Sequence, residues 1–167
     1  MPDNTIYHAY TTTYDGLSNK LINDIVVCSE GKRVTAKAQW DTGASGTCIS
    51  SDVVDALGLI PTGKQIIQTP SGQSVVNTYS VNIEFPNNLT ISDLMVCGTK
   101  IGEQGIQVLI GMDVLLLGDF AVSNYRGKTV FSFRIPSKKT TDYVKEISIE
   151  NLIGPKHGKG KRKKKRK

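Results

Sequence analysis

Asp41-Thr42-Gly43-Ala44 is the stretch that decides how this chain of 167 residues is interpreted. It follows residues 34–40, where Val, Ala, Ala and Trp alternate with polar side chains, the pattern of a strand with one buried face. The tripeptide Asp-Thr-Gly alone means little, because roughly 3% of chains of this length contain it by chance. An aspartate at this place can also be an ordinary Asx-turn residue, so the surrounding sequence has to discriminate.

A second motif lies further along the chain. Leu109-Ile110-Gly111-Met112-Asp113 places an apolar pair, a glycine and an acid before a short apolar segment that predicts a helix of one or two turns, residues 112–117. Between the two motifs, residues 64–68 and 74–85 predict a hairpin, because the connection at residues 69–73 contains Pro-Ser-Gly.

The rest of the chain predicts short strands separated by turns, as in an all-β sandwich or barrel. Residues 51–57 predict a short helix that opens on Ser-Asp as N-cap and stops at Gly58. Residues 120–123 and 129–135 predict a second hairpin. Residues 137–155 fit a strand and a helix comparably well, and the tyrosine-containing N-terminal segment fits an edge strand or an arm.

Taken together, the strand-end Asp-Thr-Gly-Ala, the hairpin and the apolar-apolar-Gly-x-Asp turn resemble one lobe of an aspartic protease, and more narrowly the retropepsins, the single-lobe proteases of retroviral type. The resemblance covers about Leu21 to Pro136. It implies an all-β fold, a closed β-barrel of the acid protease type with one or two short helices. We expect an N-terminal arm at residues 1–20, the protease domain at 21–136, a C-terminal extension at 137–155 and a disordered basic tail at 156–167.

The chemistry of such enzymes explains the need for two aspartates. Without a metal or a covalent intermediate, one carboxylate must take a proton from water and one carboxylic acid must give a proton. Two carboxyl groups about 3 Å apart share a proton and so supply both roles. Asp-Thr-Gly occurs once and Asp-Ser-Gly does not occur. The resemblance therefore implies a homodimeric aspartic endopeptidase in which Asp41 faces Asp41 of the partner subunit, with a peptide or protein substrate and no cofactor or metal ion.

The resemblance also assigns supporting roles. Thr42, Gly43 and Ala44 would support the active-site loop, with Thr42 hydrogen-bonding across the two-fold axis. The tip of the first hairpin would be a flap that closes over an extended peptide. The residues expected in this flap are Pro70, Ser71, Gly72 and Gln73.

Gly111 and Asp113 match the second motif of the family, which packs behind the catalytic loop and is structural. Viral members have an arginine after the glycine, whereas this chain has Met112. The apolar residue favours the cellular and bacterial branch of the family.

The positive charge of the chain is concentrated at one end. Residues 156–167 hold 9 of the 21 Lys and Arg residues and none of the 15 acidic residues, so the formal charge of +6 leaves −3 on residues 1–155. A run of this composition has nothing to bury and does not fold alone. It fits a solvated tail, or a weak contact with nucleic-acid phosphates or an anionic membrane surface.

Cysteine use and the start of the chain indicate a cytoplasmic protein. Cys28, Cys48 and Cys97 are odd in number and lack C-x-x-C spacing, so we expect reduced thiols. Residues 1–5 lack the charge and apolar run of a signal peptide, and no apolar stretch approaches the roughly 20 residues that span a bilayer. Cys48 follows Asp41 closely, but no histidine in the predicted core could activate it, so we expect a packing role.

Two other functions are open at this stage. The chain could be a non-catalytic, retropepsin-like dimerisation or peptide-binding module, because folds outlive their chemistry. It could also be a nucleic-acid-associated protein whose β domain only dimerises and whose basic tail binds phosphates. Cleavage of a peptide would exclude the first, and salt-sensitive binding that is lost without residues 156–167 would favour the second.

Overall fold

A computed structural model describes residues 5–69 and 72–153. Within these residues the chain forms ten strands, three α-helices and two short 3-10 helices. The strands are β1 (His8–Thr13), β2 (Leu21–Ser29), β3 (Lys32–Trp40), β4 (Cys48–Ser50), β5 (Gly63–Thr69), β6 (Gly72–Phe85), β7 (Leu89–Thr99), β8 (Val108–Ile110), β9 (Asp119–Ser123) and β10 (Val130–Ile135). The helices are α1 (Ser51–Leu57), η1 (Gly102–Gln104), α2 (Met112–Leu115), η2 (Tyr125–Gly127) and α3 (Tyr143–Ile153).

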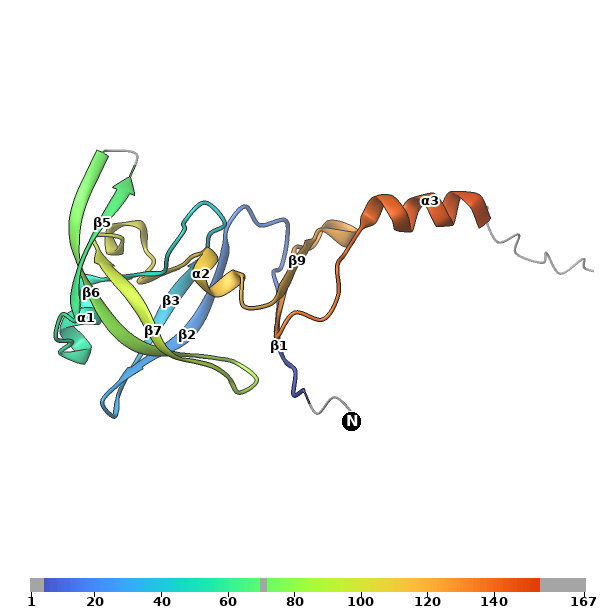
Figure 1. The fold of residues 1–167 in the computed structure, drawn as a ribbon. Helices are drawn as coiled ribbons and strands as arrows, with labels where there is room; N and C mark the ends of the chain where they lie inside the picture. Colours follow the sequence, from blue (N-terminus) through green and yellow to red (C-terminus); the bar gives the residue numbers. More distant parts are fainter. Residues whose placement is uncertain (1–4, 70–71, 154–167) are drawn as a thin grey trace, which may run out of the picture.

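The larger sheet closes on itself. Its strand order is β2-β3-β8-β4-β7-β6-β5, and an additional pairing joins β2 to β6. The closing register pairs Val26 with Glu84 and Cys28 with Asn82. Strand β5 continues the sheet beyond the closed ring, where it forms a long hairpin with β6 (Figure 1). The predicted all-β fold with a closed barrel is confirmed, with three α-helices where one or two short ones were expected.

A second, three-stranded sheet has the order β1-β10-β9. In it, His8 pairs with Ile135 and Thr13 with Val130, so the first and the last strand lie side by side. The segment that the sequence left between an arm and an edge strand is therefore the strand β1. The predicted hairpin at residues 120–135 is also confirmed, as β9 and β10.

Trp40 packs where the two sheets meet. Its ring lies 5.3 Å from that of Phe85 in the barrel, and 4.7 Å and 5.2 Å from those of Phe131 and Phe133 in the smaller sheet. Its indole N–H donates to the Asn23 side-chain oxygen at 3.0 Å, which satisfies the one polar atom of a residue that is only 5% exposed. Each aromatic pair contributes about 0.5–1.5 kcal/mol beyond its buried area. The residue before Asp41 is thus firmly held.

Helix α1 begins one residue earlier than an N-cap at Ser51 would require. Ser51 is inside the helix and Ser50 is the N-cap, but no side-chain hydrogen bond caps the helix. The Ser50 hydroxyl is buried and has no partner in the part of the chain that the structure describes. The predicted stop is confirmed, because Gly58 adopts a left-handed conformation with φ of 64° and its N–H donates to the Asp55 carbonyl.

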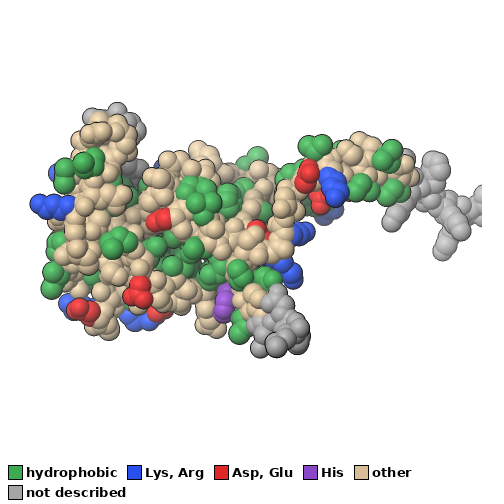
Figure 2. Space-filling model, viewed as in Figure 1, with side chains coloured by type: hydrophobic (Ala, Val, Ile, Leu, Met, Phe, Trp, Pro, Cys, Tyr) green, Lys and Arg blue, Asp and Glu red, His purple; other side chains and the backbone are tan. Residues whose placement is uncertain are grey.

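The undecided segment after the domain contains helix α3, which projects away from the barrel (Figure 1). Hydrophobic side chains are visible along it in Figure 2. Its large apolar residues, all exposed, are Tyr143, Val144, Ile147, Ile149, Leu152 and Ile153. Across residues 5–69 and 72–153, no helix combines the length and the apolar character that crossing a membrane requires. The basic tail predicted at residues 156–167 lies outside the described residues.

Candidate active site

Asp41 is placed by the end of β3. Strands β3 and β8 are parallel neighbours in which Trp40 pairs with Ile110, and the Asp41 N–H continues that ladder by donating to the Ile110 carbonyl at 2.9 Å. The Asp41 carboxylate accepts a hydrogen bond of 2.8 Å from the Gly43 N–H. The side chain is half-buried. A carboxylate is therefore held at the end of a buried strand with one face open.

Gly43 is needed for this arrangement. A Cβ atom at position 43 would lie 3.1 Å from the Asp41 carboxylate oxygen Oδ1, closer than ordinary van der Waals contact. A side chain at position 43 would require the carboxylate or the backbone to shift by a few tenths of an ångström. The glycine thus lets the backbone approach the acid, as the sequence resemblance implies.

The loop that follows Asp41 is bound to the second motif. The Met112 N–H donates to the Ala44 carbonyl at 2.8 Å, and the Asp113 N–H donates to the Ser45 carbonyl at 3.2 Å. The Asp113 carboxylate accepts two further hydrogen bonds of 2.8 Å, from the backbone N–H and the hydroxyl of Thr47. The two motifs therefore form one hydrogen-bonded unit.

Gly111 lies directly against the same loop. Its N–H donates to the Thr47 hydroxyl oxygen at 3.2 Å. A Cβ atom at position 111 would lie 2.6 Å from the carbonyl carbon and oxygen of Gly46, a distance that backbone atoms do not tolerate. Close packing of two backbones accounts for this glycine.

The remaining predicted site residues are Thr42 and the four residues of the expected flap. Thr42 is exposed, and its hydroxyl has no hydrogen-bond partner among residues 5–69 and 72–153. The strands of the expected flap are present, and Thr69 pairs with Gly72 at the last described rung of the hairpin. Of the four flap residues, Gly72 and Gln73 belong to β6, while Pro70 and Ser71 lie outside the described residues.

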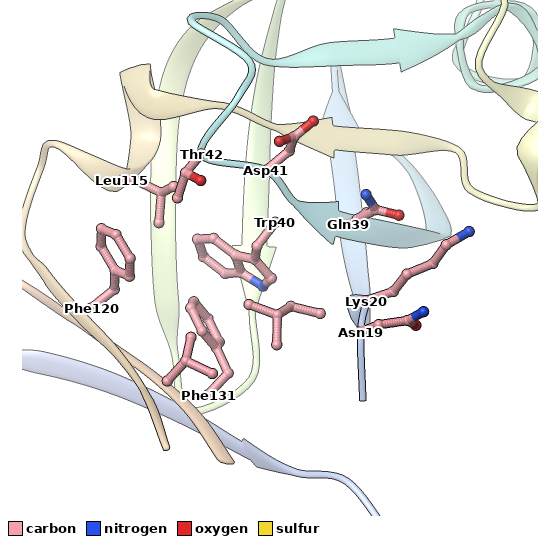
Figure 3. Close-up of a pocket in the computed structure, with 11 residues that line it drawn as sticks. Asn19, Lys20, Gln39, Trp40, Asp41, Thr42, Leu115, Phe120 and Phe131 are labelled. Carbon is pink, nitrogen blue, oxygen red and sulfur yellow. The ribbon is translucent and has the colours of Figure 1, made fainter. Parts of the chain in front are cut away.

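A pocket of about 300 Å³ adjoins Asp41 and Thr42. Figure 3 shows Lys20, Asn19 and Gln39 on one side of Trp40, and Leu115, Phe120 and Phe131 on the other side. The polar side chains come from the segment directly before β2 and from the end of β3, and the apolar side chains come from α2, β9 and β10. Leu115 and Phe131 are buried in the core, whereas Phe120 is 41% exposed and presents apolar surface to the pocket.

Comparison with known proteins places this geometry in a family. The family described as "Aspartyl protease" matches residues 25–114, which is more than half of the chain. The matched residues include both motifs. The chain belongs to the aspartyl protease family. A search of curated proteins found no match.

Solved structures of retropepsin-like proteases resemble this aspartyl protease chain. A retropepsin-like aspartic protease from Rickettsia conorii is 15% identical with a TM-score of 0.51, over 80% of this chain and 98% of its own. The simian foamy virus protease is 17% identical with a TM-score of 0.42, over 57% of this chain and 91% of its own. The EIAV protease, solved with the inhibitor HBY-793, is 17% identical with a TM-score of 0.46, over 62% of this chain and 91% of its own. The Rickettsia structure supports the retropepsin-like fold.

The thiols of this aspartyl protease chain are poorly suited to nucleophilic chemistry. Burial first, and then the neighbouring Cys97, its register partner on β7, raise the pKa of Cys48 to about 11. Burial is also the main cause of a raised pKa at Cys97 and at Cys28. These directions agree with the packing role expected for Cys48. No three His, Cys, Asp or Glu side chains of the described chain lie close enough together to hold a metal ion.

Two groups of residues in the site were missed by sequence reasoning. Thr47 binds Asp113 and Gly111, yet a threonine six residues after an aspartate carries no recognisable signal. Lys20 and Gln39 line the pocket beside Asp41. Their proximity follows from the antiparallel register of β2 and β3, which could have been deduced only after pairing those two strands.

Proposed function

We propose that this aspartyl protease chain is an endopeptidase that acts as a homodimer, with Asp41 of each subunit forming the catalytic pair. The proposal rests on the position of Asp41, a half-exposed carboxylate held at a strand end by backbone hydrogen bonds at both its N–H and its side chain. The chain contributes one such motif, and the chemistry needs two carboxyl groups.

In the proposed reaction the paired carboxyl groups share one proton. The ionised carboxylate takes a proton from water, whose oxygen attacks the carbonyl carbon of the peptide. The protonated carboxyl gives its proton to the carbonyl oxygen. The C–N bond of the tetrahedral diol then breaks as the amine nitrogen takes a proton from the first carboxyl group. A hydroxyl of the diol returns its proton to the second carboxylate as it becomes the new carboxyl carbonyl, so the pair again shares one proton.

The surface beside Asp41 supports the need for a second copy. Thr42 and Gly43 are exposed, and the Thr42 hydroxyl is without a hydrogen-bond partner in the described residues. We propose that Thr42 hydrogen-bonds to the partner subunit across the two-fold axis, and that this bond orients the two loops. Ala44 is tied to α2 by its carbonyl and would hold the loop in place from behind.

The hairpin formed by β5 and β6 is the proposed flap. It extends beyond the closed barrel (Figure 1), and its cross-strand pair Ile66 and Val75 is 65% and 67% exposed. Exposed apolar side chains on a projecting hairpin are suited to covering an extended peptide. We propose that the peptide binds beneath the flap as an added strand.

The remaining parts of the proposal concern boundaries and location. We propose a catalytic domain at residues 21–136, an N-terminal segment at 1–20 whose strand β1 joins that domain by pairing with β10, an extension at 137–155 and a basic tail at 156–167. We also propose a cytoplasmic location, supported by three free cysteines. A contact of the tail with nucleic acid or an anionic surface stays a prediction from its charge alone.

The test of this function is the variant Asp41→Asn. Wild-type protein should cut a denatured protein or a peptide library, a statine-type mimic of the transition state should inhibit it, and Asp41→Asn should lose cleavage while it stays a folded dimer by sedimentation. Asp55→Asn, a change of an exposed acid on α1, is the matched control and should cleave normally. Full activity in Asp41→Asn contradicts the mechanism. A confirmed wild-type dimer that cuts nothing between pH 4 and pH 8 indicates the non-catalytic peptide-binding module instead.

A further inference from the structure

Helix α3 presents large apolar side chains to solvent. No residue of the helix is buried against the rest of the described chain, and Leu152, 87% exposed, is the most exposed large apolar side chain of residues 5–69 and 72–153. The helix begins at a cap, since the Asp142 carboxylate accepts a hydrogen bond of 3.0 Å from the Lys145 N–H. An isolated helix of 11 residues is only marginally stable in water. A surface that covers its apolar side chains therefore stabilises this helix.

The apolar side chains of α3 form two groups on opposite sides of the helix. Successive residues of an α-helix are rotated by about 100° about its axis. In the first half of α3, this rotation brings Tyr143, Val144 and Ile147 to one side. Lys145 and Glu146 lie on the other side. The first half is thus amphipathic on its own.

The second half of α3 is amphipathic in the opposite direction. Ile149, Leu152 and Ile153 lie within about 100° of one another, on the side away from the first apolar group. We call these three residues the C-terminal face of α3. The polar residues of this half lie on the side away from the C-terminal face and are Ser148, Glu150 and Asn151. The C-terminal face is therefore a separate apolar surface.

Positive charge follows the C-terminal face directly in the sequence. The basic tail begins at residue 156, three positions after Ile153, and holds 9 Lys and Arg residues and no acidic residue. Residues 138–167 contain 12 basic and 3 acidic residues, a formal charge of +9, whereas residues 1–137 contain 9 basic and 12 acidic residues, a formal charge of −3. An anionic surface therefore attracts the end of the chain that carries α3 and does not attract the barrel.

A lipid bilayer with anionic headgroups matches both the apolar surface and the charge. Apolar side chains that enter the lipid and basic residues that contact headgroups strengthen each other, whereas one such signal alone binds weakly. Nucleic acid attracts the charge through its phosphates but offers the C-terminal face no apolar contact. The helix is about 16 Å long, roughly half of the hydrocarbon thickness of a bilayer, so it docks on the surface and does not cross.

We propose that the C-terminal face of α3 and the basic tail bind the protein peripherally to a bilayer surface that carries anionic lipids. The cytoplasmic leaflet of cell membranes is such a surface, which agrees with the proposed cytoplasmic location. The first apolar group of α3 and the barrel stay outside the lipid. Binding does not involve Asp41, so Asp41→Asn should bind vesicles as wild type does, whether or not the chain is a peptidase.

The test measures how the full chain partitions onto sedimented vesicles of phosphatidylcholine, with and without phosphatidylserine. Wild-type protein should bind the vesicles with phosphatidylserine at least about tenfold more tightly than the neutral ones, and added salt should weaken this binding. Replacing Lys163 and Lys164 together with Gln should weaken it about tenfold, because two charges near the headgroups are lost.

Paired variants of α3 test the C-terminal face. Leu152→Gln with Ile153→Gln should weaken binding to the anionic vesicles at least about tenfold, because two apolar side chains no longer enter the lipid. Val144→Gln with Ile147→Gln makes the same kind of change on the other side of the helix and is the matched control. It should bind within a few fold of wild type. Glutamine is a good helix former, so both pairs keep the helix, which circular dichroism checks.

Three results overturn the inference. The first is wild-type protein that does not prefer the anionic vesicles, or two paired variants of α3 that bind them equally. The second is tight binding of an RNA or DNA oligonucleotide by wild type, with vesicle binding that is unaffected by Leu152→Gln and Ile153→Gln, because the tail then serves nucleic acid. The third is altered dimer dissociation in that paired variant with unchanged vesicle binding, which assigns the C-terminal face to a contact between subunits.

Discussion

Thr47 donates two hydrogen bonds to the carboxylate of Asp113, one from its backbone N–H and one from its hydroxyl, each 2.8 Å long. The two residues are 66 positions apart in the chain. Thr47 ends the loop that begins at Asp41, and Asp113 lies in the first turn of α2. This pair therefore ties the proposed catalytic loop to the segment behind it.

Replacing Asp113 with Asn should destabilise the protein by about 1–3 kcal/mol, because one buried N–H or hydroxyl of Thr47 would lose its acceptor. Asn offers one acceptor atom and two donors where the carboxylate offers two acceptor atoms. Urea unfolding followed by Trp40 fluorescence measures the change. Asp55→Asn is the control and should stay within about 0.5 kcal/mol of wild type. Equal free energies of unfolding for Asp113→Asn and Asp55→Asn would show that the hydrogen bonds between Thr47 and Asp113 do not stabilise the fold.

Gly111→Ala should be strongly destabilising, because its methyl group would lie 2.6 Å from the Gly46 carbonyl group. Gly46→Ala is the matched control on the other side of the same contact, since its Cβ would meet nothing within 4 Å. We expect the first change to lower the free energy of unfolding by at least about 2 kcal/mol and the second to alter it by less than about 1 kcal/mol. Thermal and urea denaturation of the pair decide the point. Similar values for both would exclude close backbone packing at this site.

The stability of the smaller sheet should depend on pH through Asp119. Hydrogen bonds from the Lys138 N–H first, then from the Ser137 hydroxyl and the Arg134 guanidinium, hold the pKa of its carboxyl well below the usual range. A lowered pKa in the folded state adds stability above the unfolded pKa of about 4, and this stability is lost as the pH falls through the folded pKa. The Tm difference between wild type and Asp119→Asn should therefore be constant from pH 5 to pH 7 and shrink below pH 4. A difference that grows on acidification contradicts the assignment.

Cys48 should react slowly with alkylating reagents although its side chain is partly accessible. With a pKa of about 11, it carries about a hundredfold less thiolate at pH 8 than an ordinary cysteine. Peptide mapping after timed treatment with iodoacetamide should show its labelling rate rising as the pH approaches 11, whereas urea-unfolded protein should label quickly at pH 8. Rapid labelling of the native protein at pH 8 would refute the raised pKa. Cys48→Ala should retain the activity of wild type.

The sequence predicted those parts of the site that depend on residues close together in the chain. The alternation that ends at Trp40 predicted β3 and its buried face. The family resemblance implied a close approach of backbone at Gly43 and a structural role for Gly111, whose contact with Gly46 was not foreseen. Thr47 and Lys20 were not expected, because their roles depend on partners that the fold brings from other strands. The periodicity of a sequence indicates which face of a helix or strand is buried, but it does not indicate how one strand pairs with another.

Two segments could not be decided from the sequence for different physical reasons. Residues 143–153 form a helix whose apolar side chains point in all directions, so no periodicity of a helix or a strand was visible. Strand β1 is stabilised by pairing with β10, which is distant in sequence, and nothing within residues 8–13 indicates that partner. Tertiary context settled both cases.

The pairing of His8 with Ile135 makes completion of the fold a late event in translation. A nascent chain that ends before β10 has neither a partner for β1 nor Phe131 and Phe133 to pack on Trp40. Such non-local pairing also slows folding, because the chain between β1 and β10 must close into a loop before these two strands make contact. The support beneath the proposed catalytic aspartate is thus assembled only after the ribosome has made almost the whole domain, so a prematurely terminated product carries the Asp-Thr-Gly motif without the packing that holds it.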